Sequence, residues 1–222
     1  MTIRNTKLLI SALGVCAAFT LAAGARMVQT NELGIFTDQS SVGKTPPGCK
    51  AHYDSASGEY RITGGGNNIW DTGDDFYFVW KKMSGNVALT ADVQFVGTSA
   101  AEHRKAVLMV RQNLDRDSAY ADVAFHGSGL TSLQFRGFAG ERTYQIFTQL
   151  EQPARLRIVR QGSRFTMYTG KPGEELKASD PVEFVSLKDP VYVGLGVCSH
   201  VATTLETAIF SNVKLEPAPE AK

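Results

Sequence analysis

Hydrophobic and polar residues alternate along most of the chain, with the period of two that is typical of a β-strand with one buried face. Residues 154–161, 163–170 and 191–198 all show this period. In residues 87–95 the alternation places five apolar side chains on a common face, namely Val87, Leu89, Ala91, Val93 and Phe95. Each of these segments is therefore predicted to be a strand that covers a core with one face.

The last strand is predicted over residues 205–215, where the alternation changes phase. Both Phe210 and Val213 are apolar, so we expect a β-bulge near Ser211-Asn212. Only residues 98–107 offer a candidate helical turn. Turn sequences that contain Gly separate the strands at residues 55–59, 83–86, 126–130, 138–141, 160–164 and 169–175. The pattern predicts an all-β protein, a two-sheet antiparallel jelly-roll sandwich.

The first 25 residues have the pattern of a secretory signal peptide. Arg4 and Lys7 form a basic start, residues 8–21 are an apolar run, and Ala23-Gly24-Ala25 matches the small-residue cleavage pattern. The apolar run is shorter than the about 20 residues of a membrane-spanning helix, and a retained membrane anchor is the alternative. We expect cleavage, a mature chain that begins near Arg26, and a periplasmic or extracellular location.

Cleavage would remove two of the 23 basic residues and none of the 22 acidic ones, so the formal net charge would change from +1 to −1. This balance gives no bulk attraction for nucleic acid or an anionic membrane. Residues 26–216 have the length of one sandwich domain with no stable membrane span. The Pro-rich tail at 217–222 is expected to be disordered, and the sequence does not define an oligomeric state.

Two cysteines, Cys49 and Cys198, follow the predicted signal peptide. In an oxidising compartment an even pair indicates a disulfide, so we expect these two residues to be bonded. The alternative is two buried free thiols, because free cysteine packs as a small hydrophobic residue. Neither cysteine lies in a recognisable nucleophile motif.

Residues 64–80, GGGNNIWDTGDDFYFVW, gather three glycines in a row, three aspartates and both tryptophans of the chain. They do not match a phosphate-binding loop, because no helix is predicted after the glycines and no Lys-Ser/Thr pair follows. We expect the glycines to allow a positive φ or a close approach of backbones between strands. Alternation places Phe76, Phe78 and Trp80 on one face of the next strand and Tyr77 and Val79 on the other.

Four segments together resemble a known bacterial family: residues 51–93, 105–125, 155–168 and 191–213. They include a Tyr-Asp turn, a Gly-rich step into Ile-Trp, a Met-x-Arg strand, and a Val-Gly-Leu strand followed by Ser-His and Phe-Ser-Asn-Val. The chain resembles, over roughly residues 33–215, the concanavalin A-like lectin/glucanase superfamily domains of the "regulation of enolase" type.

This resemblance implies a concanavalin A-like jelly roll that binds carbohydrate or protein. It does not imply one settled activity, because the fold alone is no warrant for function. The chain departs from the family before Lys105, where an aromatic residue is common and His103 and Arg104 stand instead.

Catalytic patterns are weak in this sequence. Retaining glycosidases need two carboxylates about 5–5.5 Å apart, and sandwich glucanases carry them on one strand as Glu-x-Asp-x-x-Glu, which is absent. Asp115 and Asp117 would share one face of a strand, but Asn113 and Ser118 beside them favour a turn. We predict no catalytic residue.

Metal sites are also weakly indicated, and we predict no cofactor. The histidines are scattered singly at positions 52, 103, 126 and 200, unlike the clustered ligands of a zinc site. Oxygen-rich turns make Asp71, Asp74, Asp115 and Asp117 weak calcium candidates, although their spacing is not that of an EF-hand. Asp in turns commonly bonds its own backbone instead.

A sugar site needs an aromatic face for stacking and planar polar groups for hydroxyls. The predicted ligand-binding residues are Trp70, Asp71, Asp75, Tyr77, Arg111 and Arg136. The alternative is that the aromatic residues pack in the core and that the arginines lie on solvated strand faces. The sequence thus favours an exported, non-catalytic, lectin-like domain that binds a glycan; an envelope protein–protein interaction domain and, third, a glycoside-processing enzyme are the alternatives.

Overall fold

The computed structural model describes residues 32–148, 150, 152, 154–183 and 187–220, and these contain strands and turns but no helix. The predicted signal peptide lies outside the described residues. The strands form two large antiparallel sheets and one hairpin. The first sheet has the order β1 (Asp38–Val42), β6 (Phe76–Met83), β16 (Val191–Cys198), β8 (Lys105–Arg111), β9 (Tyr120–His126), β10 (Thr131–Arg136) and β11 (Tyr144–Phe147).

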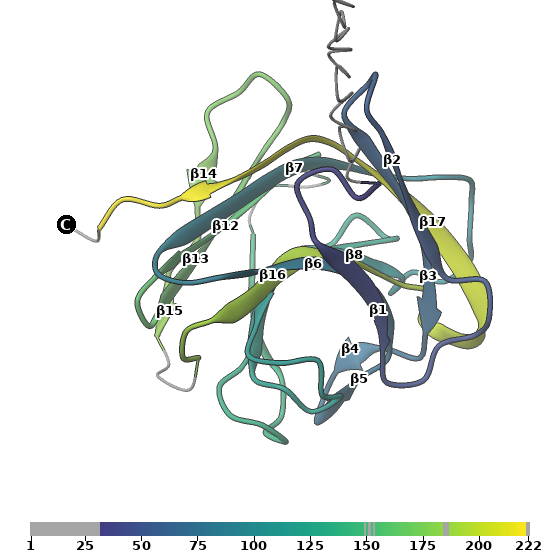
Figure 1. The fold of residues 1–222 in the computed structure, drawn as a ribbon, viewed down its shortest axis with the longest axis horizontal. Helices are drawn as coiled ribbons and strands as arrows, with labels where there is room; N and C mark the ends of the chain where they lie inside the picture. The colour runs from purple at the N-terminus through teal and green to yellow at the C-terminus, as the bar shows by residue number, and fades with distance from the viewer. Residues whose placement is uncertain (1–31, 149, 151, 153, 184–186, 221–222) are drawn as a thin grey trace, which may run out of the picture.

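The second sheet has eight strands. Its order is β14 (Lys177–Ala178), β13 (Arg164–Gly170), β12 (Arg155–Gln161), β7 (Val87–Phe95), β17 (Val201–Pro217), β3 (Glu59–Gly66) and β2 (Lys50–Asp54), with β15 (Val182–Glu183) also paired to β13. The hairpin joins β4 (Ile69–Trp70) to β5 (Gly73–Asp74). Figure 1 shows the sheets as two layers, with the hairpin on the side of the first sheet that faces away from the second. The predicted all-β, two-sheet antiparallel sandwich is confirmed.

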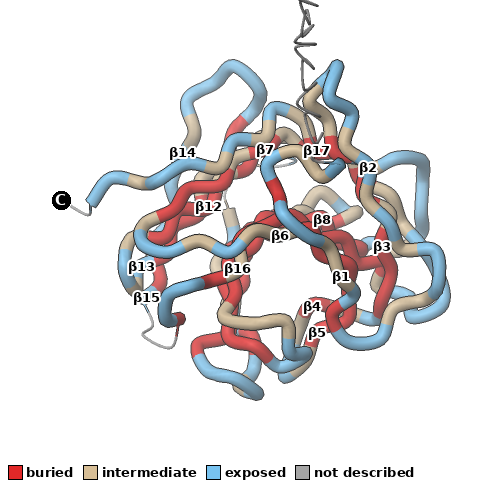
Figure 2. The backbone as a smooth tube through the Cα atoms, viewed as in Figure 1, coloured by how far each residue is buried: buried red, intermediate tan, exposed pale blue. Residues whose placement is uncertain are grey.

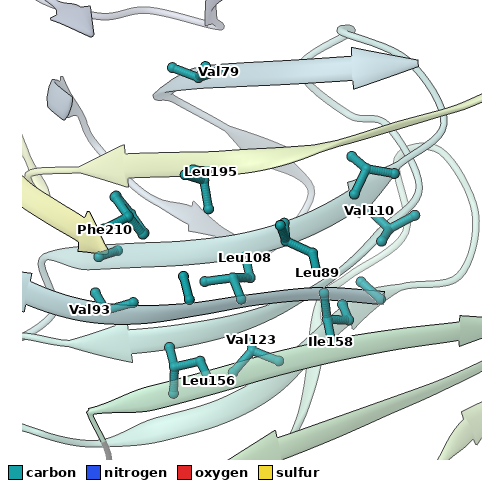
Figure 3. Packing of buried hydrophobic residues seen from close by; sticks show 14 of the residues in the cluster. Val79, Leu89, Val93, Leu108, Val110, Val123, Leu156, Ile158, Leu195 and Phe210 are labelled. Carbon is teal, nitrogen blue, oxygen red and sulfur yellow. The ribbon is translucent and has the colours of Figure 1, made fainter. Parts of the chain in front are cut away.

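The main core lies between the two sheets. Figure 3 shows Leu108 and Leu195 of the first sheet packed with Leu89, Ile158 and Phe210 of the second. All five side chains are fully buried. Leu89, Ile158 and Leu195 come from alternating apolar positions of their strands, whereas Leu108 lies in the continuous apolar run of β8.

The outer face of the first sheet is covered as well. Phe76 and Phe78 lie in a second apolar cluster with Ile69 of the hairpin, whereas Tyr77 and Val79 point into the main core. Figure 2 shows buried stretches in both layers and at the hairpin. β6 is consequently buried on both faces, as expected for a strand with a layer on each side.

Three local predictions can be compared with the structure. The bulge in β17 is confirmed, because its pairing with β7 shifts between Ser211 and Lys214 and Asn212 has a φ of 51°. At Gly66, with a φ of 132°, an added Cβ would lie 2.0 Å from the Asp75 carbonyl oxygen, so the predicted close backbone approach is also confirmed. The segment 98–107 forms no helix; it turns and enters β8.

The predicted Cys49–Cys198 disulfide is not formed in the structure, where both residues are free cysteines. The physical reason is their placement. Cys49 packs against the main core, whereas Cys198 belongs to the cluster on the opposite face of the first sheet. Burial raises the pKa of the Cys198 thiol to about 11.

The described residues contain no helix that is long and apolar enough to cross a membrane.

Candidate functional site

The outer face of the first sheet carries a row of charged and amide side chains. Strands β8, β9 and β10 are neighbours, and their register places Lys105 opposite His126 and Asp122 opposite both Met109 and Gln134. The register also places Arg111 and Arg136 opposite Tyr120, further along the same face. These polar residues form two groups, one at each end of the face.

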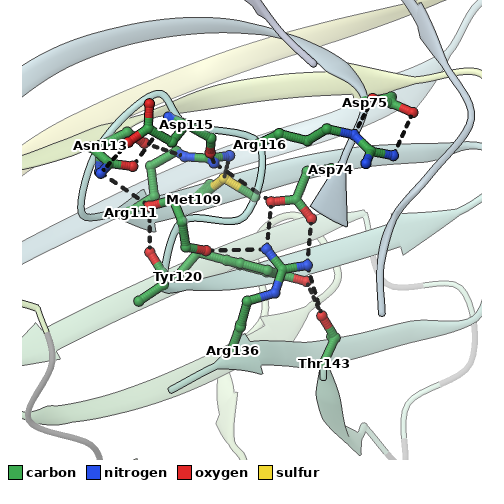
Figure 4. A network of polar contacts seen from close by, with 12 residues as sticks. Asp74, Asp75, Met109, Arg111, Asn113, Asp115, Arg116, Tyr120, Arg136 and Thr143 are labelled. Carbon is green, nitrogen blue, oxygen red and sulfur yellow. Dashed lines mark hydrogen bonds and ion pairs between the residues drawn. The ribbon is translucent and has the colours of Figure 1, made fainter. Parts of the chain in front are cut away.

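The first group is the Asp74 network (Asp74, Arg111 and Arg136), drawn in Figure 4. Two nitrogens of Arg136, Nη2 and Nη1, donate to the two oxygens of Asp74 at 2.8 and 2.9 Å. Arg111 Nη2 lies 3.5 Å from Asp74 Oδ2. All three side chains have 0% exposure. A buried bidentate pair of this kind is strong only when the remaining donors are also satisfied.

Backbone carbonyls of three loops satisfy those donors. Arg111 donates to the carbonyls of Asn113 and Asp115 at 2.6 and 2.7 Å. Arg136 donates to the Asp71 carbonyl at 2.8 Å and to that of Glu141 at 3.0 Å. The network therefore ties the hairpin and the loops after β8 and β10 onto the sheet, which is a structural role.

Asp75, next to the network, is paired separately. Arg116 Nε donates to Asp75 Oδ1 at 2.8 Å, and the Lys44 amide donates to the same oxygen at 2.8 Å. Burial alone would raise the pKa of Asp75, but these bonds favour its charged form and lower the pKa overall. Its carboxylate is thus occupied by groups of the protein itself.

The second group surrounds a cavity of about 160 Å³, which we call the Lys105 pocket. It lies at the other end of the same face, between the strands and the start of the hairpin. Its lining is one aromatic indole, three amides, three imidazoles, one amine and one aliphatic side chain, from Trp70, Asn68, Gln134, Gln145, His103, His126, His200, Lys105 and Leu130.

Hydrogen bonds fix several of these side chains. Lys105 Nζ donates to Asn68 Oδ1. His126 Nδ1 lies 3.0 Å from the Leu130 carbonyl oxygen, so Nδ1 carries the proton and Nε2 is left as an acceptor. The centroid of the His103 ring lies 5.9 Å from that of His126 and 5.4 Å from that of His200.

Burial and the charge of Lys105 favour the neutral form of two of the imidazoles, those of His126 and His200. Burial is the main cause that lowers the pKa of His126 to about 3, and the positive charge of Lys105 is the next largest. The same two causes lower the pKa of His200. Burial also lowers the pKa of Lys105 and raises that of Asp122 well above its usual range. Several shifted pKa values beside one cavity are typical of a functional site.

Buried polar atoms without a partner gather at this end of the face. Within the described part of the chain, neither carboxyl oxygen of Asp122 has a hydrogen-bond partner, and Gln134 Oε1 and His200 Nδ1 lack one too. Asp122 and Gln134 are almost fully buried. Since buried polar groups are normally satisfied, such atoms call for a ligand or ordered water.

The predicted ligand-binding residues do not form one site. Trp70 lines the Lys105 pocket, and Asp71 is exposed near Arg142. Tyr77 is buried in the main core, where its hydroxyl donates to Gln39 Oε1 at 2.9 Å. Asp75, Arg111 and Arg136 serve the ion pairs described above. The alternative given for Arg111 and Arg136, that they lie on solvated strand faces, is wrong, because the hairpin and loops cover them and both are fully buried.

The weak calcium candidates are likewise spread out. Asp74 is paired with two arginines, and Asp115 accepts a hydrogen bond from Asn113 Nδ2 at 2.8 Å. Asp117, as predicted, lies in a turn, and so does Asp115. Among the described residues, no group of three or more His, Cys, Asp or Glu side chains is arranged to hold a metal ion.

Sequence reasoning missed Lys105, Asp122 and the gathering of three histidines. The histidines come from separate segments, so only the fold brings them together. A usable signal was present for both residues, because Lys105 directly precedes the apolar run of residues 106–110 and Asp122 is the one charged residue within the apolar run of residues 119–125.

No family model matches this chain, and no curated protein matches it. A functionally unknown protein from Saccharomyces cerevisiae is similar in structure, with a TM-score of 0.61, 14% identity, and coverage of 85% of this chain and 99% of that one.

Two carbohydrate-related structures are similar at a TM-score of 0.50. The lectin UEA-II, complexed with galactose, is 8% identical and covers 81% of this chain and 98% of its own. The alginate lyase AlgAT5 of polysaccharide lyase family 7 is 11% identical, and the match covers 76% of this chain and 82% of the lyase chain. At these identities the likeness shows the fold, which is a concanavalin A-like sandwich.

Proposed function

We propose that this concanavalin A-like sandwich is an exported, non-catalytic domain that binds carbohydrate in the Lys105 pocket. We also propose that it belongs to the "regulation of enolase" type of the superfamily, on the strength of the sequence resemblance. The lectin and the lyase that share its fold act on or bind sugars, which supports the class of ligand.

The composition of the pocket is the observation that carries the proposal. Trp70 supplies an indole beside the cavity, and Asn68, Gln134 and Gln145 supply planar amides. Sugar rings stack on aromatic faces while their hydroxyls exchange hydrogen bonds with planar polar groups. The unpartnered Gln134 Oε1 is an acceptor of the kind that a sugar hydroxyl would satisfy.

The carboxylates support a binding role over glycoside hydrolysis. Hydrolysis by the usual mechanism needs two carboxyl groups beside the scissile bond. None of the residues that line the pocket is acidic. Asp74 and Asp75, the acidic residues of the hairpin end, are occupied by arginines.

A protein partner is the second candidate, because one edge of the first sheet exposes aromatic side chains. Phe138, Tyr144 and Phe147 are 59%, 51% and 48% exposed. Tyr144 and Phe147 belong to β11, an edge strand, and exposed edge strands can pair with another chain.

A glycan array separates the two candidates. Wild type is expected to bind at least one glycan, Trp70→Ala to lose that binding, and Tyr144→Ala, which alters an exposed aromatic outside the pocket, to retain it. Circular dichroism should show that both variants are folded. If wild type binds no glycan on the array, the sugar proposal is overturned. If only Tyr144→Ala loses glycan binding, the binding site lies at the β11 edge instead.

Export has a separate test. Mass spectrometry of the protein recovered from its native host should give a mature N-terminus near Arg26. Recovery of a chain that retains residues 1–25 in the cytoplasm would contradict export without bearing on sugar binding.

A further inference from the structure

We propose that the sugar bound in the Lys105 pocket carries an anionic oxygen group, a carboxylate or a sulfate ester, which pairs with Lys105 Nζ. The inference rests on the proposed function, and it names the chemical class of ligand that the pocket selects.

Lys105 is a buried amine with no carboxylate partner: burial lowers its pKa, and an external anion would favour its charged form. The residue is 2% exposed. Within the described residues it takes part in no ion pair, whereas Arg104 just before β8, Arg111 at the end of β8 and Arg136 of β10 each face a carboxylate within 4 Å. Its hydrogen bond goes to Asn68, a neutral amide. Because a buried charge is costly unless it is paired, the position favours an external anion.

The surroundings of Lys105 do not provide that anion. The pocket lining contains no acidic side chain. The acidic groups that act electrostatically on Lys105 are Cys198, Asp122 and Asp74. Asp74 is already matched by two guanidinium groups, and the Cys198 thiol stays protonated at neutral pH since burial raises its pKa to about 11.

Asp122 is the carboxyl group on which the inference depends. Its side chain is fully buried and neither oxygen accepts a hydrogen bond from a described residue. A carboxylate in that position would lack the donors that stabilise its charge, so burial favours the neutral acid. A neutral Asp122 leaves Lys105 at the cavity without an anionic partner from the protein.

The three histidines add no competing negative charge. His103, His126 and His200 line the same cavity and are neutral or cationic, never anionic. An anionic substituent therefore meets one ammonium group and no carboxylate. A neutral sugar in the same place would displace water from Lys105 without pairing its charge, and would bind more weakly.

Matched sugar pairs test the inference by isothermal titration calorimetry. Each pair shares its stereochemistry and differs at one substituent: glucuronate with glucose oligosaccharides, galacturonate with galactose, mannuronate with mannose, and a sulfated galactan with its desulfated form. Wild type is expected to bind the acidic member of at least one pair about tenfold or more tightly than the neutral member. The uronate and sulfate arms distinguish the two sources of the anion.

Two variants locate the effect. Lys105→Met should abolish the preference for the acidic member, and Lys82→Met, which removes an exposed cation of β6, should preserve it. Both melting temperatures are measured, and the wild-type comparison within each pair does not depend on any variant. Equal binding of acidic and neutral members would overturn the inference and leave the sugar proposal standing. Binding of no sugar in any pair would overturn both.

Discussion

Two groups of charged side chains lie on one face of the same sheet, and they are built differently. In the Asp74 network, a carboxylate faces two arginines whose other donors reach loop carbonyls. In the Lys105 pocket, a lysine and three histidines line a cavity, and buried atoms of Gln134, His200 and the neighbouring Asp122 have no hydrogen-bond partner among the described residues. The charges of the first group are paired within the protein, whereas the second group keeps polar atoms that have no partner among the described residues.

The difference shows how burial alone can mislead. Arg111 and Lys105 sit at the two ends of β8, and both are almost fully buried. The two residues differ in their partners: Arg111 has an ion pair and hydrogen bonds, whereas Lys105 pairs with no carboxylate among the described residues, and a buried charge without a partner costs free energy. Four substitutions make this comparison quantitative.

Asp74→Asn should have the largest effect. It removes the only carboxylate that faces Arg111 and Arg136 among the described residues, and leaves two guanidinium groups buried together. Loss of one partner from a buried ion pair costs about 3–5 kcal/mol. Urea unfolding should report this loss in the free energy of unfolding. A loss below about 1 kcal/mol would show that the network does not hold the loops in place.

His126 should make stability depend on pH. Its pKa falls from 6.5 to about 3 on folding, so between these values the unfolded chain binds a proton that the folded chain does not. The free energy of unfolding should therefore fall as pH falls from about 6.5 toward 3, by up to about 1.4 kcal/mol per pH unit from this residue.

The matched variants for this prediction are His126→Gln and His52→Gln. Unfolding measured across the pH range should give a flatter profile for His126→Gln. The exposed His52→Gln variant should keep the wild-type slope. Identical slopes in all three proteins would contradict a neutral, buried His126.

Asp122→Asn should be more stable than wild type at pH 7. Burial raises the pKa of Asp122, so above the unfolded value of 3.8 the folded chain keeps a proton that the unfolded chain releases, and stability declines as pH rises. The amide has no such cost, and we expect a gain of about 1 kcal/mol or more at pH 7. The gain should vanish below pH 3.8; a variant that is less stable at both pH values would argue against a neutral acid in wild type.

Arg142→Ala should have the smallest effect. Its ion pair with Asp71 spans 3.4 Å, with both side chains mostly exposed. Solvent and salt screen such pairs, so the free energy of unfolding should change by less than about 0.5 kcal/mol. A larger loss would mean that Arg142 also fixes the Asp71 carbonyl that Arg136 requires.

The alternation of residues was enough to predict the sandwich, the bulge in β17 and the two faces of β6. It could not predict the site, because alternation tells which residues share a face and not what covers that face. Arg111 and Arg136 read as solvated, yet the β4–β5 hairpin and the loops bury them. The three pocket histidines are up to 97 positions apart, at 103 and 200, and only the fold joins them.

The central claim, that the Lys105 pocket is the ligand site, is tested most directly by the fluorescence of one tryptophan. The chain has two, and Trp70 lines the pocket whereas Trp80 contacts Tyr192 on β16. In Trp80→Phe the emission comes from Trp70 alone. Titration with an oligosaccharide that calorimetry shows to bind should shift or quench this emission with the same dissociation constant. Binding by calorimetry with unchanged Trp70 emission would contradict the claim.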